Sequence, residues 1–114
     1  MILLTDQIRA ALLANGEKTK ADLDHDPRPV VKLFTPDAGA TWLLTELDPD
    51  EPDIAFGLCD LGLGCPELGS VRISEIESVR GRLGLPVERD LHFRADKSLS
   101  AYAVEASARG AIRA

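Results

Sequence analysis

Three polar side chains, Glu88, Asp90 and His92, have the types and spacing that metal or acid–base chemistry requires. They occupy alternate positions of the segment PVERDLHF, and alternate residues of a β-strand point to the same face. Two carboxylates and an imidazole on one face can hold a divalent cation or transfer protons. Polar residues at alternate positions are typical of any exposed strand face, and no serine or cysteine nucleophile lies beside these three in the sequence. We therefore assign no catalytic residue, and keep as the alternative a metal-dependent enzyme that uses this face with help from Asp60 or Glu67.

Two cysteines and several glycines lie close together in the segment GLCDLGLGCPELG, residues 57–69. The five residues between Cys59 and Cys65 exceed the usual spacing of zinc loops, and the C-x-x-C motif of redox pairs is absent. The glycines match neither G-x-G-x-x-G nor the P-loop pattern, so a phosphate site is not indicated. We expect a turn between two strands, in which Gly62 and Gly64 adopt positive φ angles and both thiols are free.

Two acidic segments, ADLDHD and DPDEPD, resemble ligand clusters only in composition. The first gathers Asp22, Asp24, His25 and Asp26, but it lacks the glycine and the distal glutamate of a calcium loop. The second, residues 48–53, contains two prolines that favour a rigid turn. We expect both segments to be solvated, and we predict no metal and no cofactor.

The N-terminal segment predicts a short amphipathic helix. Thr5 is suited to the N-cap, and Asn15 with Gly16 resembles a helix stop. Residues 17–29 lose the apolar periodicity and end in two prolines, which predicts a surface loop.

The centre of the chain predicts four strands in series. Their residues are rich in β-branched and aromatic types, and turn-forming residues separate them. The connections are too short for helical crossovers, so the strands should form an antiparallel meander. Trp42 is expected in the core. The predicted strands are residues 30–35, 40–47, 54–61 and 68–73.

The last third predicts a fifth strand and two helices. Residues 86–93 alternate, with Val87, Leu91 and Phe93 on one face, and Arg89 falls on that apolar side and requires a carboxylate partner. Ser74 and Glu77 match a capping box before a helix that stops at Gly81, and Ser98 or Ser100 suits the N-cap of a C-terminal helix. Together the elements predict one α+β domain over residues 1–114: an antiparallel meander sheet of about five strands with helices packed on one face.

Composition and charge limit the function classes. The chain has 114 residues, 45% hydrophobic and 28% charged, which is typical of a globular domain. No apolar run is long enough to cross a membrane and no signal peptide is evident, so we expect a cytoplasmic protein. The net charge of −6 disfavours nucleic acid as a partner. Residues 1–71 carry five basic and thirteen acidic side chains, whereas residues 72–114 carry eight and six, which favours a protein partner with a basic surface.

The segments KLFTPDAGATWLLTELDPDEPDIAFGLCDLGLG and PELGSVRISEIESVRGRLGLPVERDLHF resemble a family of small bacterial proteins known as domain of unknown function 2958. The resemblance covers nearly the whole chain. It implies a single-domain cytoplasmic protein that is often encoded in plasmid or mobile-element regions. It implies no catalytic residue, cofactor or ligand.

We therefore predict a small non-enzymatic protein-interaction or accessory module of bacterial mobile genetic elements. Mimicry of DNA by the acidic face is a special case of this hypothesis, and the metal-dependent enzyme remains the alternative. The oligomeric state is left open.

Overall fold

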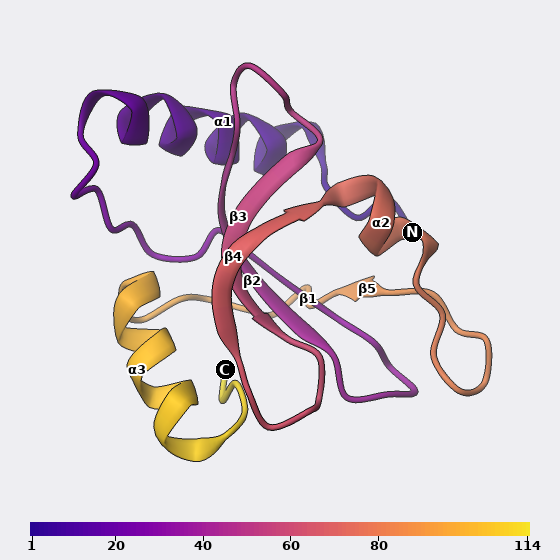
Figure 1. The fold of residues 1–114 in the computed structure, drawn as a ribbon. Helices are drawn as coiled ribbons and strands as arrows, with labels where there is room; N and C mark the ends of the chain where they lie inside the picture. The colour runs from indigo at the N-terminus through magenta and orange to yellow at the C-terminus, as the bar shows by residue number, and fades with distance from the viewer.

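A computed structural model describes all 114 residues and contains one antiparallel sheet with three helices (Figure 1). The sheet has five strands in the order β4-β3-β2-β1-β5, and each neighbouring pair is antiparallel. This arrangement confirms the α+β class and the antiparallel meander for β1 to β4, whereas β5 returns to the other edge of the sheet and pairs with β1. None of the helices combines the length and apolarity that a membrane crossing requires. The elements are α1 (Asp6–Ala21), β1 (Val31–Phe34), β2 (Thr41–Leu47), β3 (Ile54–Asp60), β4 (Glu67–Arg72), α2 (Ile73–Ser78), β5 (Glu88–Arg89) and α3 (Leu99–Arg109).

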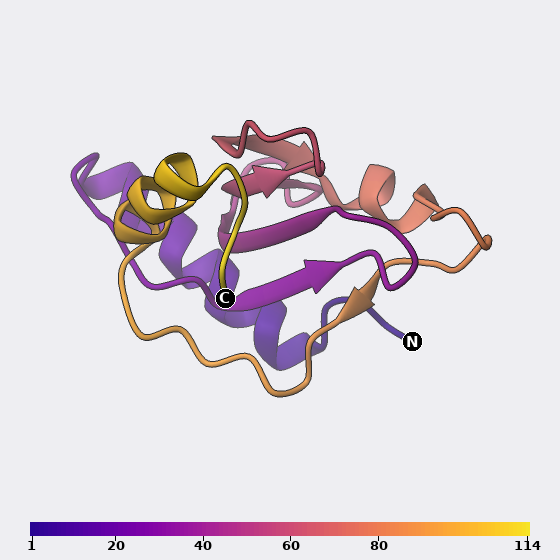
Figure 2. The ribbon, with the colours of Figure 1, turned by 90° about the horizontal axis from the view of Figure 1, so that it is seen from below.

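The two faces of the sheet carry separate apolar cores. Trp42 and Leu44 of β2 point into the larger core, as expected for Trp42, and α1 and α2 cover it. Leu43 points to the opposite face and packs with Leu58 and with Tyr102 of α3. Figure 2 shows α1 and α3 on opposite sides of the sheet. The expectation that helices pack on one face therefore holds for α1 and α2 and not for α3.

A β-bulge at Thr45 sets the direction of the side chains at the end of β2. Leu44 is in register with Gly57 and Glu46 is in register with Phe56, so Thr45 is the extra residue. Regular alternation would place Leu44 and Leu47 on opposite faces. Because of the bulge, both leucines reach the same core and Glu46 points to the opposite face.

Helix α1 continues past its predicted end. Thr5 caps the first turn as expected, but the helix extends five residues beyond Gly16. Asn15 Nδ2 donates a 2.8 Å hydrogen bond to the carbonyl of Thr45 at the bulge. Gly16 is buried against the carbonyl of Leu47, where a Cβ atom would overlap the oxygen. The predicted stop was wrong because these two residues dock α1 onto β2.

The turn between β3 and β4 agrees with the prediction from the sequence. Gly62 and Gly64 have φ angles of +80° and +86°, which side chains other than glycine rarely adopt. Cys59 is half-buried, Cys65 is exposed, and the two thiols form no disulfide.

Helix α2 begins at Ile73 with Arg72 at the N-cap, two residues earlier than a capping box at Ser74 requires. Ser74 does not cap this helix. Instead, its backbone N–H and its hydroxyl both donate to the carboxylate of Asp53 in the β2–β3 turn, at 2.9 and 2.7 Å. These hydrogen bonds lower the pKa of Asp53. The first turn of α2 is thus held by a residue from a distant turn.

The predicted fifth strand is reduced to the two residues of β5. Beyond it the chain leaves the sheet, and Leu91 is 66% exposed instead of facing inward with Val87. Arg89 does not have a carboxylate partner. Its guanidinium donates to the carbonyls of Ile2 and Leu3, which satisfies the charged group with backbone acceptors.

Candidate functional site

The structure does not bring Glu88, Asp90 and His92 together on one strand face. Glu88 lies on β5, whereas Asp90 and His92 lie in the turn beyond it. Asp90 Oδ1 accepts from the backbone N–H of His92 at 2.9 Å, and Oδ2 lies 3.4 Å from Lys32 Nζ. The hydrogen bond from the His92 backbone is the main cause that lowers the pKa of Asp90, and the contact with Lys32 lowers it further. The imidazole of His92 is exposed, and no three His, Cys, Asp or Glu side chains in the chain form a group that could hold a metal ion.

Asp60 and Glu67 do not extend this set. Asp60 is 4% exposed; its Oδ1 accepts from the N–H of Gly62 at 2.8 Å and its Oδ2 accepts from the N–H of Ile112 at 3.0 Å. Both oxygens are therefore engaged by the backbone, and the carboxylate fastens the C-terminal segment to the end of β3. Glu67 is exposed at the start of β4.

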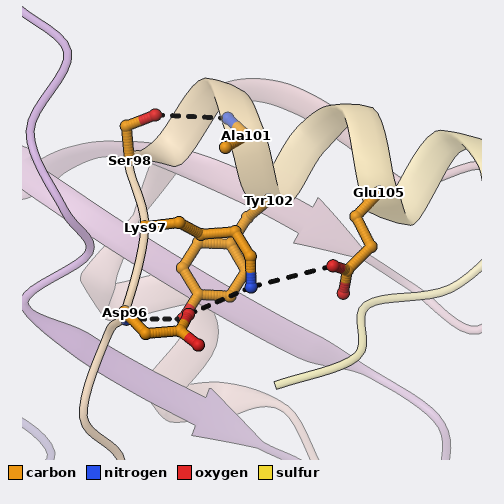
Figure 3. Close-up of polar contacts among 6 residues, drawn as sticks. All are labelled: Asp96, Lys97, Ser98, Ala101, Tyr102 and Glu105. Atoms are coloured by element: carbon orange, nitrogen blue, oxygen red, sulfur yellow. Dashed lines mark hydrogen bonds and ion pairs between the residues drawn. The ribbon is translucent and has the colours of Figure 1, made fainter.

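A compact polar cluster lies at the start of α3 (Figure 3). Lys97 Nζ lies 4.1 Å from the ring centroid of Tyr102, 3.0 Å from Asp96 Oδ1 and 3.7 Å from Glu105 Oε2. The hydroxyl of Tyr102 donates to Asp96 Oδ1 at 2.9 Å. The hydrogen bond between Lys97 and Asp96 raises the pKa of the lysine and lowers that of the carboxyl, while burial raises the pKa of Tyr102. The cluster satisfies its own charges, so we interpret it as an anchor for α3.

A groove of about 510 Å³ opens between the C-terminal half of α1, the loop that follows it and the β2–β3 turn. Apolar residues of β3 and acidic residues of β2 and the turn lie side by side along it. We name it the acidic groove. Its lining residues are Gly16, Thr19, Lys20, Leu23, His25, Glu46, Asp48, Pro49, Asp50, Ile54, Ala55, Phe56 and Ser70.

The acidic groove contains two carboxylates without a cationic partner. Lys20 Nζ lies 2.8 Å from Asp50 Oδ2, and this hydrogen-bonded pair raises the pKa of Lys20. Glu46 accepts only from the hydroxyl of Thr19, at 3.1 Å, and Asp48 accepts from the backbone N–H of Asp50 at 2.9 Å. Glu46 is also half-buried. A half-buried carboxylate with a single neutral donor is a favourable site for a cation.

The loop after α1 supplies the apolar side of the groove. Leu23 is 88% exposed, and His25 Nε2 is buried without a hydrogen-bond partner. The loop is held in place because Asp26 accepts from the backbone and hydroxyl of Ser100 on α3, contacts that lower the pKa of Asp26. The segment ADLDHD, expected to be only a solvated loop, therefore lines the groove with Leu23 and His25.

Sequence reasoning did not single out Glu46 or Leu23. Glu46 is the one charged residue in the strand TWLLTEL, which is a usable signal for an acid placed at a sheet surface. Leu23 gave no signal, because a single leucine in a polar loop is common on protein surfaces.

A family model described as "Protein of unknown function (DUF2958)" matches residues 3–113. Neither a curated protein nor a solved structure matches the chain.

Proposed function

Because the chain belongs to the DUF2958 family, whose description assigns no reaction, we propose from its geometry that it is a non-enzymatic interaction module. It binds a basic, extended segment of a partner protein in the acidic groove. An accessory role in bacterial mobile genetic elements and a cytoplasmic location, which the family resemblance implies, belong to the same proposal.

The observation that carries this proposal is the carboxylate of Glu46, half-buried and without a cationic partner. Coulombic attraction is stronger where protein replaces water around the charge, and it is less screened by salt. A lysine or arginine that reaches Glu46 therefore gains more than it would on an open surface. Asp48 lies on the same groove and adds to the negative potential.

The apolar residues of the groove suit the rest of such a segment. Phe56 lies opposite Glu46 across the β2–β3 pair, and Leu23 stands almost fully exposed in the facing loop. Lysine and arginine carry long aliphatic stems that pack on apolar surfaces while the charged end remains free. The groove thus offers a contact for the stem as well as for the charge, and its volume fits a few side chains.

The test is binding of a fluorescent peptide of alternating lysine and valine, measured by anisotropy at about 50 mM and about 200 mM salt. We expect saturable binding that weakens with salt, and a loss of about fivefold in Glu46→Gln. Glu88→Gln is the matched control, because it removes the same charge from a half-buried position on the edge strand β5, outside the acidic groove.

A peptide of alternating glutamate and valine serves as the charge control and should not bind. Equal losses in Glu46→Gln and Glu88→Gln would show that only net charge matters, which contradicts a defined groove. Absence of binding to the lysine peptide at low salt would also overturn the proposal.

A further inference from the structure

A hairpin formed by residues 80–86 projects from the body of the molecule; we name it the finger. Arg80 forms an isolated antiparallel bridge with Pro86, and the N–H of Gly81 donates to the carbonyl of Leu85 at 3.1 Å. The N–H of Gly84 donates back to the carbonyl of Gly81 at 3.0 Å, which closes the tip. These backbone hydrogen bonds give the finger a defined shape.

Asp37 of the β1–β2 turn fixes the finger to the sheet. Its Oδ2 accepts from the N–H of Leu83 at 2.7 Å and from the N–H of Leu85 at 3.2 Å. Gly81 lies directly against this carboxylate, and a side chain there would collide with it. The finger is therefore attached to the β1–β2 turn through the backbone of its tip, while the side chains of Arg82 and Leu83 remain exposed.

The finger presents a cation beside a leucine. Leu83 is 81% exposed, and Arg82 is exposed without a hydrogen bond or ion pair. Arg80 bonds only to the carbonyls of Glu77 and Val79. Neither arginine forms an ion pair, and the acid that lies at the finger, Asp37, is engaged by the backbone N–H groups of Leu83 and Leu85.

We propose that the finger of one molecule inserts into the acidic groove of a second copy of the same chain. Arg82 would meet Glu46, and Leu83 would meet Leu23 and Phe56, so the half-buried carboxylate gains a cation and Leu83 gains an apolar contact. This inference rests on the proposed function, since it names the basic segment that the groove takes.

The positions of the two surfaces set the form of the assembly. The finger lies on the opposite side of the molecule from the loop after α1 (Figures 1 and 2). A contact between two different surfaces is heterologous, so it leaves one free finger and one free groove on every dimer. Growth then continues head to tail until a ring closes or the protein concentration limits it.

The test is sedimentation velocity at concentrations from about 10 μM to about 1 mM, with Glu46→Arg and Arg82→Ala as variants. The wild type should increase in mass with concentration, and each variant alone should remain monomeric. An equimolar mixture of the two variants should form a dimer and nothing larger, because only one intact groove and one intact finger are available. Equal melting temperatures of the variants and the wild type exclude a folding defect.

A second measurement separates this inference from the proposed function. A fluorescently labelled Glu46→Arg chain, whose finger is intact, should bind the Arg82→Ala chain, whose groove is intact, and lose about fivefold in affinity when Glu46→Gln is added to the latter. If the lysine–valine peptide binds the Arg82→Ala chain and the labelled Glu46→Arg chain does not, the groove binds basic segments but a second copy is not its partner. A wild-type mass that is independent of concentration, association that persists in both single variants, or a mixture that stays monomeric would each overturn the inference.

Discussion

The buried carboxylate of Asp60 binds the backbone N–H of Ile112, a residue 52 positions later in the chain, at 3.0 Å. The same carboxylate binds the N–H of Gly62, so one side chain holds both the β3–β4 turn and the segment after α3. The sequence suggested Asp60 as an additional metal ligand. In the structure its carboxylate instead connects two distant segments of the backbone.

Asp60→Ala should destabilise the protein by about 3 kcal/mol, because it leaves two N–H groups without their charged acceptor. Thermal unfolding should show a fall in Tm of about 10 °C. Hydrogen exchange should also accelerate at the amide of Ile112. Glu67→Ala, at an exposed carboxylate nearby in sequence, should change the stability by less than about 0.5 kcal/mol. Similar effects of both substitutions would contradict this role.

Gly16→Ala should destabilise the protein by about 1 to 3 kcal/mol, although alanine is the better helix former. The added methyl group overlaps the carbonyl of Leu47, so α1 must move away from β2. The measurement is the free energy of unfolding in urea. Ala14→Gly, at an exposed position of the same helix, should cost only the helix propensity of about 1 kcal/mol. A stabilised Gly16→Ala variant would show that α1 does not contact β2 at this point.

The two thiols should differ in their reaction with a disulfide reagent. Burial raises the pKa of Cys59, whereas Cys65 is exposed in the turn. Since the thiolate is the reactive form, we expect one fast and one slow thiol in the native protein, and two fast thiols after unfolding. Cys65→Ser should remove the fast phase and Cys59→Ser should retain it. The opposite assignment would contradict the orientation of β3.

Asp96→Asn should reduce stability in a way that depends on pH. Hydrogen bonds from Lys97 and then from Tyr102 lower the pKa of Asp96 in the folded protein. Such a group stabilises the fold above its unfolded pKa of about 4, and the contribution is lost as the pH falls through the folded value. The Tm of Asp96→Asn should therefore lie below that of the wild type at about pH 7, and the difference should vanish near about pH 2.

Asp24→Asn is the control for this experiment, because its exposed side chain has no partner. It should leave Tm unchanged at both pH values. A difference between Asp96→Asn and the wild type that stays constant across the pH range would show that the substitution acts through packing and not through charge.

The meander was predictable because its signals are local. Short turns and β-branched residues specify strands and their antiparallel order without reference to distant contacts, and the glycines at 62 and 64 specify the turn. The end of α1 was not predictable, because Asn15 and Gly16 match a stop signal as well as they match a docking surface. Only the carbonyls of Thr45 and Leu47, about thirty residues away, distinguish the two.

The candidate site was less predictable than the fold. Glu88, Asp90 and His92 alternate as a strand face should, but β1 provides partners for only two residues of β5, so the expected face does not exist. The acidic groove joins residues from α1, β2 and β3 that no spacing rule connects. The Glu46 side chain points into the groove because of the β-bulge at Thr45, and the residue types of β2 do not indicate that bulge.

The extra residue at Thr45 makes the length of this stretch more informative than its composition. An insertion or deletion of one residue between Trp42 and Glu46, outside the bulge, would reverse the faces of the residues that follow it. The carboxylate would then point into the core and a leucine toward water. Relatives can thus be sorted by the number of residues between Trp42 and Glu46. Those that keep this number and the glutamate keep the carboxylate on the same face of the sheet.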